Sequence, residues 1–498
     1  MNEKIFPAFN DFESFAHDYS YVPICREIVA DLDTPLTLYH KLAADEEFSF
    51  LLESLEGGER WGRYSLIGYR PALLFCQRHG EIEINRDGHK ELIKTADPLP
   101  EIARIMKLME PAPVSGLPDF YGGAVGFFSF ETVKAFEKIP HTVACDIDGA
   151  DAWFMVPEIL LVHDNLRHSL SLVRLVAVGT GVKERETLAS LYRDAVSDLE
   201  EVVQRIRQPL AWVAPTPVTE PLTFTSNMSQ DDFIRMVERA VDYVEAGDLI
   251  QVVLAQRFQC LQALDPGAIY RALRLINPSP YLFHFNFKGE RLIGSSPELL
   301  VKKNGSRVAV RPIAGTRPRG ADAAADLRLA EELLADPKEV AEHIMLVDLG
   351  RNDIGRVSTY GKVLVEELMK IERYSHVMHI VSHVEGELRP GLDMFDTFRA
   401  CYPAGTVSGA PKVRALEVID ELEPTRRGPY AGAVGYFGFS GDMDFAITIR
   451  TVTVKDDLVH FQAGAGIVAD SIPEMEYQET LNKASAMRRA LELAAKGW

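Results

Sequence analysis

Two strand-like segments in opposite halves of the chain are almost identical. Residues 123–130 read GAVGFFSF, and residues 432–439 read GAVGYFGF. A second match places Leu-Ile-Gly shortly after Gly-Glu-Arg, starting at Gly58 and again at Gly289. An ancient duplication explains both matches, but so does the chance recurrence of apolar strands that contain glycine. Under either explanation, the repeated strands favour large antiparallel sheets that pack against each other.

The two copies lie on either side of a proline-rich segment. Residues 208–221 contain four prolines and follow an amphipathic helical pattern over 182–206, which is typical of an extended linker. We therefore divide the chain into an N-terminal region (1–207), a linker (208–221) and a C-terminal core (222–498). Because similar strands occur in both regions, we expect the first region to interleave with the core. The expected fold class is α+β, with two large facing antiparallel sheets flanked by helices.

Charge and composition limit the possible partners and locations. The chain has 498 residues and a formal net charge of −20, so its summed field would repel nucleic acid and anionic membranes. It has no signal-like N-terminus and no apolar run of about 18 residues, so we expect a soluble cytoplasmic protein. The five cysteines form no Cys-x-x-Cys pair, and we expect reduced core thiols.

Hydrophobic spacing predicts the secondary structure of the C-terminal half. A proline at the first turn favours a helix start, and a proline inside a helical pattern favours a break, here at Pro337. The predicted helices span 229–246, 323–348 and 473–496, and the predicted strands span 249–256, 281–287, 308–312 and 446–454.

Two acidic pairs lie in the last two of these helices. Glu339 and Glu342 form one pair, and Glu476 and Glu479 form the other. Residues at i and i+3 share one face of a helix, so each pair can point its carboxylates in one direction. Four converging carboxylates suit a hard divalent cation such as Mg²⁺, whereas separate pairs would be ordinary solvated helix surfaces.

Several longer motifs accompany the acidic pairs in a fixed order. Together they resemble the chorismate-utilising enzyme family, and most closely its anthranilate-forming large subunits. The resemblance is dense in the C-terminal half, and in the N-terminal half it rests on LLES at 51–54 and GGERWGR at 57–63. The C-terminal motifs are GSSPE (294–298), RPIAGTRPRG (311–320), AEHIMLVDLGRND (341–353), PAGTVSGAPK (403–412) and the segment 464–479.

The resemblance implies an enzyme that converts chorismate and ammonia to anthranilate and pyruvate, the first committed step of tryptophan biosynthesis. Relatives that make 4-amino-4-deoxychorismate instead carry a lysine where this chain has Ala314. A glutamine amidotransferase small subunit would supply the ammonia, because no cysteine here lies in a Gly-x-Cys-x-Gly context, and the two chains would form a hetero-oligomer. A non-enzymatic binding module is the third alternative.

The resemblance also assigns roles around the substrate. Glu342 and Glu479 would be direct Mg²⁺ ligands, and Glu339 and Glu476 would hold metal-bound waters. Standing alone, an arginine at a strand end such as Arg450 would more often be an ion-pair partner. The substrate-binding positions implied are Thr316, Tyr430, Arg450, Lys483 and the backbone at Gly464 and Gly466.

Four further residues take catalytic positions by the same resemblance. Glu298 would be the general acid, a role that requires a carboxyl protonated near neutral pH. His379 would lie near the substrate ring during pyruvate elimination, and Thr406 would contact the substrate. Gln251 replaces the lysine base of water-adding relatives, and ammonia needs no such base. Without the resemblance, Glu298 reads as a solvent carboxylate and His379 as a satisfied core histidine.

A feedback site for L-tryptophan is implied between two segments. Carboxylate and hydroxyl groups would take the ammonium of tryptophan, and apolar side chains would flank its indole. Leu282 stands where relatives have methionine, and the second segment also has the chemistry of an ordinary turn. The residues are Glu53, Ser54, Asn277, Pro278, Ser279, Pro280, Tyr281 and Leu282.

Overall fold

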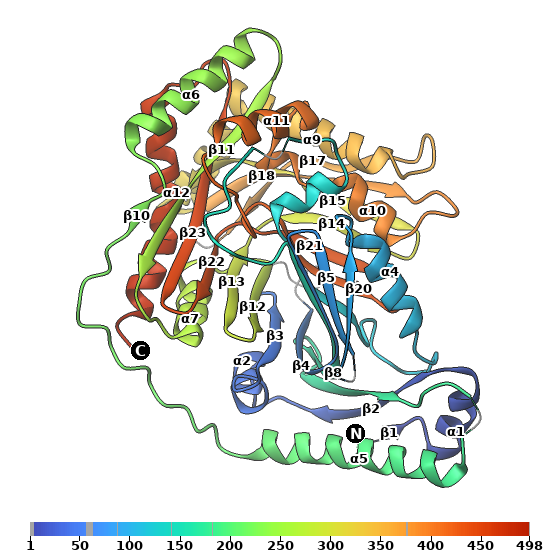
Figure 1. Cartoon of the computed structure of the whole chain (residues 1–498). Helices are drawn as coiled ribbons and strands as arrows, with labels where there is room; N and C mark the ends of the chain where they lie inside the picture. Colours follow the sequence, from blue (N-terminus) through green and yellow to red (C-terminus); the bar gives the residue numbers. More distant parts are fainter. Residues whose placement is uncertain are drawn as a thin grey trace.

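Two antiparallel sheets share a pair of long strands in the computed structural model (Figure 1). The structure describes residues 4–55, 63–86, 88–140, 142–181, 183–374 and 377–497. The first Gly-Glu-Arg copy and most of the GGERWGR motif lie outside these residues. The shared strands are β4 (Tyr64–Arg78) and β8 (Ala152–Asp164), whose opposite ends pair with different neighbours.

The first sheet extends from one end of the shared pair to both sides. Its centre joins strands from both halves of the chain, because β3 pairs with β12. In spatial order its strands are β1 (Ile5–Phe6), β2 (Tyr21–Val29), β9 (Ser169–Ala177), β8, β4, β3 (Phe48–Glu53), β12 (Tyr281–Phe287), β13 (Glu290–Ser296), β22 (Thr451–Lys455), β23 (Leu458–Ile467) and β11 (Gln251–Leu261), with β10 (Thr225–Ser226) and β19 (Gly409–Ala410) paired to β11.

The second sheet extends from the other end of the shared pair. Near one end of this sheet, β18 pairs with β15 and β16 on one edge and with β17 on the other. In spatial order the strands are β6 (His89–Lys94), β5 (Glu81–Arg86), β4, β8, β7 (Gly123–Phe128), β20 (Ala433–Gly438), β21 (Met443–Ile447), β14 (Leu299–Asn304), then β15 (Arg307–Val310) and β16 (Ile313–Pro318) along the same edge of β18 (Val377–Glu387), and finally β17 (Leu364–Arg373).

The two nearly identical segments pair with each other. β7 and β20 run antiparallel, and Gly126 of one strand lies opposite Gly435 of the other. A Cβ at Gly126 would strike the backbone of Trp153, and one at Gly435 would strike the backbone of Asp444. Each glycine therefore allows a neighbouring strand to approach closely. This pairing joins the N-terminal region to the core in the middle of a sheet.

A buried layer of mostly large apolar side chains separates the sheets. Trp153 on β8 and Phe287 on β12 stack with ring centroids 5.0 Å apart, and Phe127 on β7 lies 6.0 Å from Phe287. The two sheets therefore face each other and helices cover their outer sides, which confirms the expected fold class. The described helices are α1 (Phe9–Asp18), α2 (Pro35–Leu42), α4 (Leu99–Leu108), α5 (Arg185–Arg207), α6 (Gln230–Glu245), α7 (Pro266–Ile276), α8 (Ala323–Ala335), α9 (Pro337–Gly355), α10 (Met394–Cys401), α11 (Lys412–Leu422) and α12 (Pro473–Ala494), with short 3₁₀ turns at Phe130–Ala135 and Gly405–Val407.

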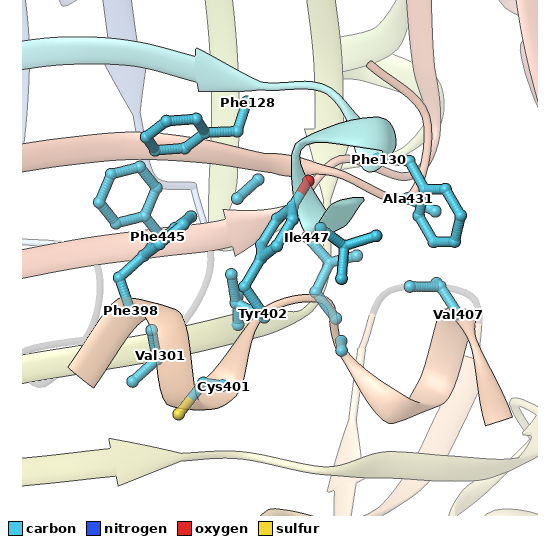
Figure 2. Close-up of a cluster of buried hydrophobic side chains, with 14 of the residues drawn as sticks. Phe128, Phe130, Val301, Phe398, Cys401, Tyr402, Val407, Ala431, Phe445 and Ile447 are labelled. Atoms are coloured by element: carbon cyan, nitrogen blue, oxygen red, sulfur yellow. The ribbon is translucent and has the colours of Figure 1, made fainter. Parts of the chain in front are cut away.

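An aromatic cluster attaches α10 to the outer face of the second sheet (Figure 2). The Phe398 ring lies 4.7 Å from Phe128 on β7 and 4.9 Å from Phe445 on β21, measured between centroids. The Tyr402 ring stacks on Phe398 at 5.0 Å. Such clusters add stacking energy of about 1 kcal/mol per pair to the burial of large rings. They hold the segment that follows α10, which includes Thr406, against the sheet.

Most predicted elements are present. The predicted helix over 323–348 breaks before Pro337 into α8 and α9, as its proline indicated. The predicted strand over 446–454 is wrong as a single element, because the chain crosses between the sheets there: β21 belongs to the second sheet and β22 to the first. Strand β16 was not predicted, and Cys145 is exposed where a core thiol was expected.

Residues 209–224 contain neither helix nor strand and run along the outside of the molecule from α5 to β10 (Figure 1). The regions before and after this segment share their sheets, because β3 and β7 pair with β12 and β20 of the C-terminal region. Within the described residues, no helix combines enough length and apolar character to span a lipid bilayer.

Candidate active site

The two acidic pairs face a common region from α9 and α12. Burial raises the pKa of Glu342, and the charges of Glu339 on the same helix and of Glu479 on α12 raise it further. Burial also raises the pKa of Glu476, and the charge of Glu479 adds to the rise. The charge of a carboxylate on one helix that raises the pKa of a carboxyl on the other indicates a region of excess negative charge between α9 and α12.

Each of the four carboxylates has one polar partner in the protein. Glu339 accepts from Arg317 at 2.9 Å, Glu476 from Ser471 at 2.7 Å, and Glu479 pairs with Lys483 at 2.7 Å. Gln251 lies 3.4 Å from Glu342. Among the described residues, no three of these carboxylates have oxygens within 4.8 Å of one another. The group is therefore open, and its oxygen donors and excess negative charge fit a hard divalent cation.

Strands β11 and β23 form the wall beside this acidic group. Gly464 lies opposite Ala255 and Gly466 opposite Val253. A Cβ at Gly466 would strike the side-chain amide of Gln251, and one at Gly464 would lie 3.1 Å from the Tyr430 hydroxyl. The Lys483 ammonium donates to the Gly464 carbonyl at 3.0 Å. The structure thus brings Gln251, Tyr430, Gly464, Gly466 and Lys483 together, and the two glycines keep the space between them open.

Glu298 is a buried carboxyl that holds its proton more tightly than an exposed glutamate does. It follows β13, and its backbone carbonyl accepts from Ile447 at 3.0 Å. Burial raises its pKa to about 7, and the nearby Thr406, Arg450 and Lys483 oppose the rise. Only 7% of the residue is exposed. A carboxyl with this pKa is partly protonated at neutral pH and can therefore donate a proton.

Arg450 occupies the crossover between the sheets. Its φ angle is 50°, in the left-handed region that non-glycine residues seldom adopt. Its Nη1 donates to Oδ1 of Asn277 at 3.0 Å, and its carbonyl accepts from the amide of Ser295 at 3.1 Å. These bonds fix both the backbone and the guanidinium, and such outliers cluster at functional sites.

His379 and Thr316 are paired residues on neighbouring strands. Nδ1 of His379 lies 3.0 Å from the Thr316 hydroxyl and 3.1 Å from the Gly315 carbonyl. Burial lowers the pKa of His379 to about 4, so the ring is neutral at physiological pH. Because a carbonyl only accepts, the proton of the neutral ring lies on Nδ1, which leaves Nε2 as the acceptor nitrogen.

The two segments expected to bind tryptophan also lie together. Leu282 on β12 pairs with Glu53 on β3, and the amide of Leu55 donates to the Ser279 carbonyl at 3.3 Å. The Glu53 carboxylate is buried and accepts from Tyr270 at 2.6 Å and from Arg274 at 3.2 Å. Glu53 is therefore already engaged by protein groups, and the tryptophan site stays a prediction.

Two contacts in the region were not anticipated from the sequence. Arg317 binds Glu339, and Asn277 binds Arg450 although it was expected only at the tryptophan segment. A cavity of about 490 Å³ lies elsewhere: its lining includes Arg319, Asp326 and Arg373 and none of the expected site residues. Arg317 lies in the 311–320 motif, but it is 22 residues from Glu339 in sequence, and no local pattern indicated that the two residues are in contact.

Comparison with known proteins identifies the family of this chain. Residues 49–489 match the family of chorismate binding enzymes. An anthranilate synthase component 1 of Aquifex aeolicus is 45% identical over 485 residues, which cover 97% of each chain. The chain belongs to the anthranilate synthase component 1 family of chorismate binding enzymes.

Other members of the anthranilate synthase component 1 family agree with this assignment. The protein from Pseudomonas aeruginosa is 45% identical over 489 residues, covering 96% of this chain and 97% of that protein. The crystal structure of anthranilate synthase component I from Streptococcus pneumoniae has a TM-score of 0.74 and 36% identity, covering 93% of this chain and 99% of the other. The menaquinone-specific isochorismate synthase of Escherichia coli, at 20% identity and a TM-score of 0.70, shares the fold.

Proposed function

We propose that this chain converts chorismate and ammonia to anthranilate, pyruvate and water as a Mg²⁺-dependent lyase. The proposal rests chiefly on Glu298, a buried carboxyl with a pKa of about 7 beside Arg450 and Lys483. Relatives named anthranilate synthase component 1 match nearly the whole chain at about 45% identity and support it. The reaction would be the first committed step of tryptophan biosynthesis.

Mg²⁺ is the cofactor that the acidic group fits. Glu342 and Glu479 would bind it directly, and Glu339 and Glu476 would bind it through water. The bound ion would neutralise the acidic group and attract the ring carboxylate of chorismate. Because chorismate is a dicarboxylate and the chain has a net charge of −20, local cations must offset this repulsion.

The protein's own cations would hold the two carboxylates of the substrate. Lys483 and the backbone at Gly464 and Gly466 would bind the ring carboxylate. Arg450, assisted by the Tyr430 hydroxyl, would bind the enolpyruvyl carboxylate with its planar fork. Asn277 already orients the guanidinium of Arg450. Thr316 and Thr406 supply hydroxyls at the remaining side of the substrate.

Proton transfer would begin at Glu298. It would protonate the leaving hydroxyl at ring C4 while ammonia adds at C2, so that water leaves. The Gln251 amide cannot accept a proton, so attack by water is not assisted, whereas neutral ammonia is a competent nucleophile. Neutral His379 would lie beside the ring in the second step, when pyruvate is eliminated and the ring becomes aromatic.

A separate glutamine amidotransferase small subunit would supply the ammonia. The relatives' designation as component 1 supports a partner, and the two chains would form a hetero-oligomer. L-Tryptophan would inhibit the enzyme by binding between residues 53–54 and 277–282. That location is favoured by the contact of these segments with each other and by the contact of Asn277 with Arg450.

The proposal is tested by incubating the chain with chorismate, Mg²⁺ and an ammonium salt at high pH. Anthranilate should form and be detected by its fluorescence and by chromatography. Formation of 4-amino-4-deoxychorismate instead would identify the second candidate, which the alanine at position 314 disfavours. Consumption of chorismate only by water would reject both assignments.

A further inference from the structure

Arg317 contacts three acidic residues, two at the start of α9 and one near the end of α8. From β16, its Nη1 donates to Glu339 at 2.9 Å and its Nη2 donates to Asp336 at 2.8 Å. Its Nε lies 3.5 Å from Glu332 at the end of α8. Only 19% of the Arg317 side chain is exposed. One guanidinium therefore joins the second sheet to both helices that pack on it.

The contact with Asp336 fixes the point where α9 begins. Asp336 is the N-cap of α9, and its Oδ1 accepts from the amides of Lys338 at 3.0 Å and Glu339 at 3.4 Å. Its other oxygen, Oδ2, accepts from Arg317. Because the chain breaks before Pro337, the direction of α9 is set at this cap and is not continued from α8.

The contact with Glu339 fixes one carboxylate of the acidic group. Oε1 of Glu339 binds Arg317, and Oε2 lies only 3.1 Å from the position that a Cβ on Gly315 would take. Gly315 has a φ of +72°, which favours glycine, and its carbonyl binds His379. A single strand therefore holds Glu339 on one side and His379 on the other.

We infer that Arg317 is a positioning residue for the metal-binding group. It fixes the start of α9 and so directs Glu339 and Glu342 toward α12. This inference rests on the proposed function, because it takes Mg²⁺ as the ligand of the group. It goes further by assigning the geometry of the group to an arginine that would touch neither the metal nor the substrate.

A purely electrostatic role and a positioning role for Arg317 predict opposite effects of its removal on Mg²⁺ binding. If Arg317 acted only as a nearby positive charge, its removal would strengthen Mg²⁺ binding, because like charges repel. If it positions α9, its removal weakens Mg²⁺ binding. Lysine keeps the charge but cannot make the two-pronged contact with Glu339 and Asp336, so Arg317→Lys should resemble Arg317→Gln and not the wild type.

Arg319 provides a matched control two residues further along. It makes the same kind of contact with Asp326 of α8, at 2.7 Å and 3.2 Å, and donates to the Tyr374 carbonyl at 2.6 Å. Within the part of the chain that the structure describes, Arg319 makes no hydrogen bond or ion pair with α9 or with the acidic pair. Arg319→Gln therefore removes a comparable clamp without releasing the start of α9.

The experiment measures Mg²⁺ binding to the full chain by calorimetry, together with thermal unfolding, for the wild type and the three variants. Mg²⁺ affinity should fall by about 10- to 100-fold in Arg317→Gln and Arg317→Lys, as is typical when groups that orient metal ligands are lost. In Arg319→Gln the Mg²⁺ affinity should stay within about twofold of that of the wild type, a change much smaller than the one expected for the two Arg317 variants.

Two results would overturn the inference while leaving the proposed function intact. One is unchanged or tighter Mg²⁺ binding in Arg317→Gln. The other is an equal loss in Arg319→Gln, which would show a general effect of destabilising the α8–α9 unit. Failure of the wild-type chain to bind Mg²⁺ at all would instead overturn the metal site itself, and both proposals with it.

Discussion

The side chain of Asn277 accepts a hydrogen bond from the guanidinium of Arg450, with 3.0 Å between Oδ1 and Nη1. The same side chain donates to the Ser295 carbonyl at 3.0 Å, and the Asn277 carbonyl accepts from the Ser295 hydroxyl. Asn277 is thus held by β13 and in turn orients Arg450. A displacement of the turn at 277–281 would be transmitted to the arginine that is proposed to bind substrate.

Replacing Asn277 by alanine should therefore weaken chorismate binding. A hydrogen bond to a charged group contributes about 1.5–3 kcal/mol, which corresponds to roughly a 10- to 100-fold increase in KM with a smaller change in kcat. Steady-state kinetics with ammonia measure both constants. Ser279→Ala is the control, because the Ser279 hydroxyl bonds the carbonyl and the side-chain nitrogen of Asn277 but not the Oδ1 that accepts from Arg450. An unchanged KM in Asn277→Ala would contradict the proposed orientation.

Glu298 should control the pH dependence of turnover. Its pKa of about 7 means that the protonated acid disappears as the pH rises through neutrality, so kcat should fall above about pH 7. The measurement needs a constant concentration of free ammonia, because ammonium itself loses its proton at higher pH. Glu298→Gln should lower kcat by about 100- to 10,000-fold while chorismate still binds. A variant with near wild-type turnover would exclude Glu298 as the acid.

The same carboxyl should reduce stability at alkaline pH. A folded-state pKa raised from 4.5 to about 7 means that the folded chain binds this proton more tightly than the unfolded chain. The stabilisation that the proton on Glu298 gives to the folded state is complete below about pH 4.5 and is lost as the pH rises through about 7. Glu298→Gln stays neutral, so its free energy of unfolding should exceed that of the wild type by up to about 3 kcal/mol above pH 8. The two proteins should be similar near pH 4. Denaturant unfolding at both pH values checks this, and a constant difference would refute it.

Glu342→Gln and Glu479→Gln should each abolish Mg²⁺-dependent turnover. Each substitution removes a negative ligand and keeps the size of the side chain. Glu474→Gln is a control on α12, because Glu474 is exposed and near the same helix start. Activity should be measured across Mg²⁺ concentrations, together with Mg²⁺ binding. Full activity in either of the first two variants would reject the assignment of metal ligands.

Ser54→Phe should remove inhibition by L-tryptophan and leave turnover largely unchanged. Ser54 directly follows β3, beside the contact between Leu55 and Ser279, where a large ring would fill the space proposed for the indole. Inhibition curves with and without tryptophan provide the test. If the inhibition constant stayed the same, tryptophan would have to bind elsewhere.

Sequence patterns were reliable where local chemistry decides the structure. The strand at 281–287 has the predicted bounds, and α12 begins at Pro473, because alternating apolar residues and a first-turn proline act locally. The break in the predicted strand at 446–454 had no local signal. Residues on both sides of it are apolar or β-branched, and only the crossover between sheets requires the left-handed conformation of Arg450.

The members of the candidate site were predicted from their motifs, but their mutual contacts were not. Asn277 and Arg450 are 173 residues apart in sequence, and nothing near either residue indicates the other. Strand β16 was missed because its glycine and its proline have low strand propensity, and its pairing with β18 overrides that propensity. As a result, Arg317 was not recognised as a partner of Glu339.

The pairing of β7 with β20 also constrains how the protein can be made. A ribosome that has finished the first half of the chain has produced β7 but not the strand that covers its free edge. The first sheet is completed still later, since β22 and β23, which lie between β13 and β11, are made only near the end of synthesis. The nascent chain must therefore keep long apolar strand edges from pairing with other molecules until translation is nearly complete.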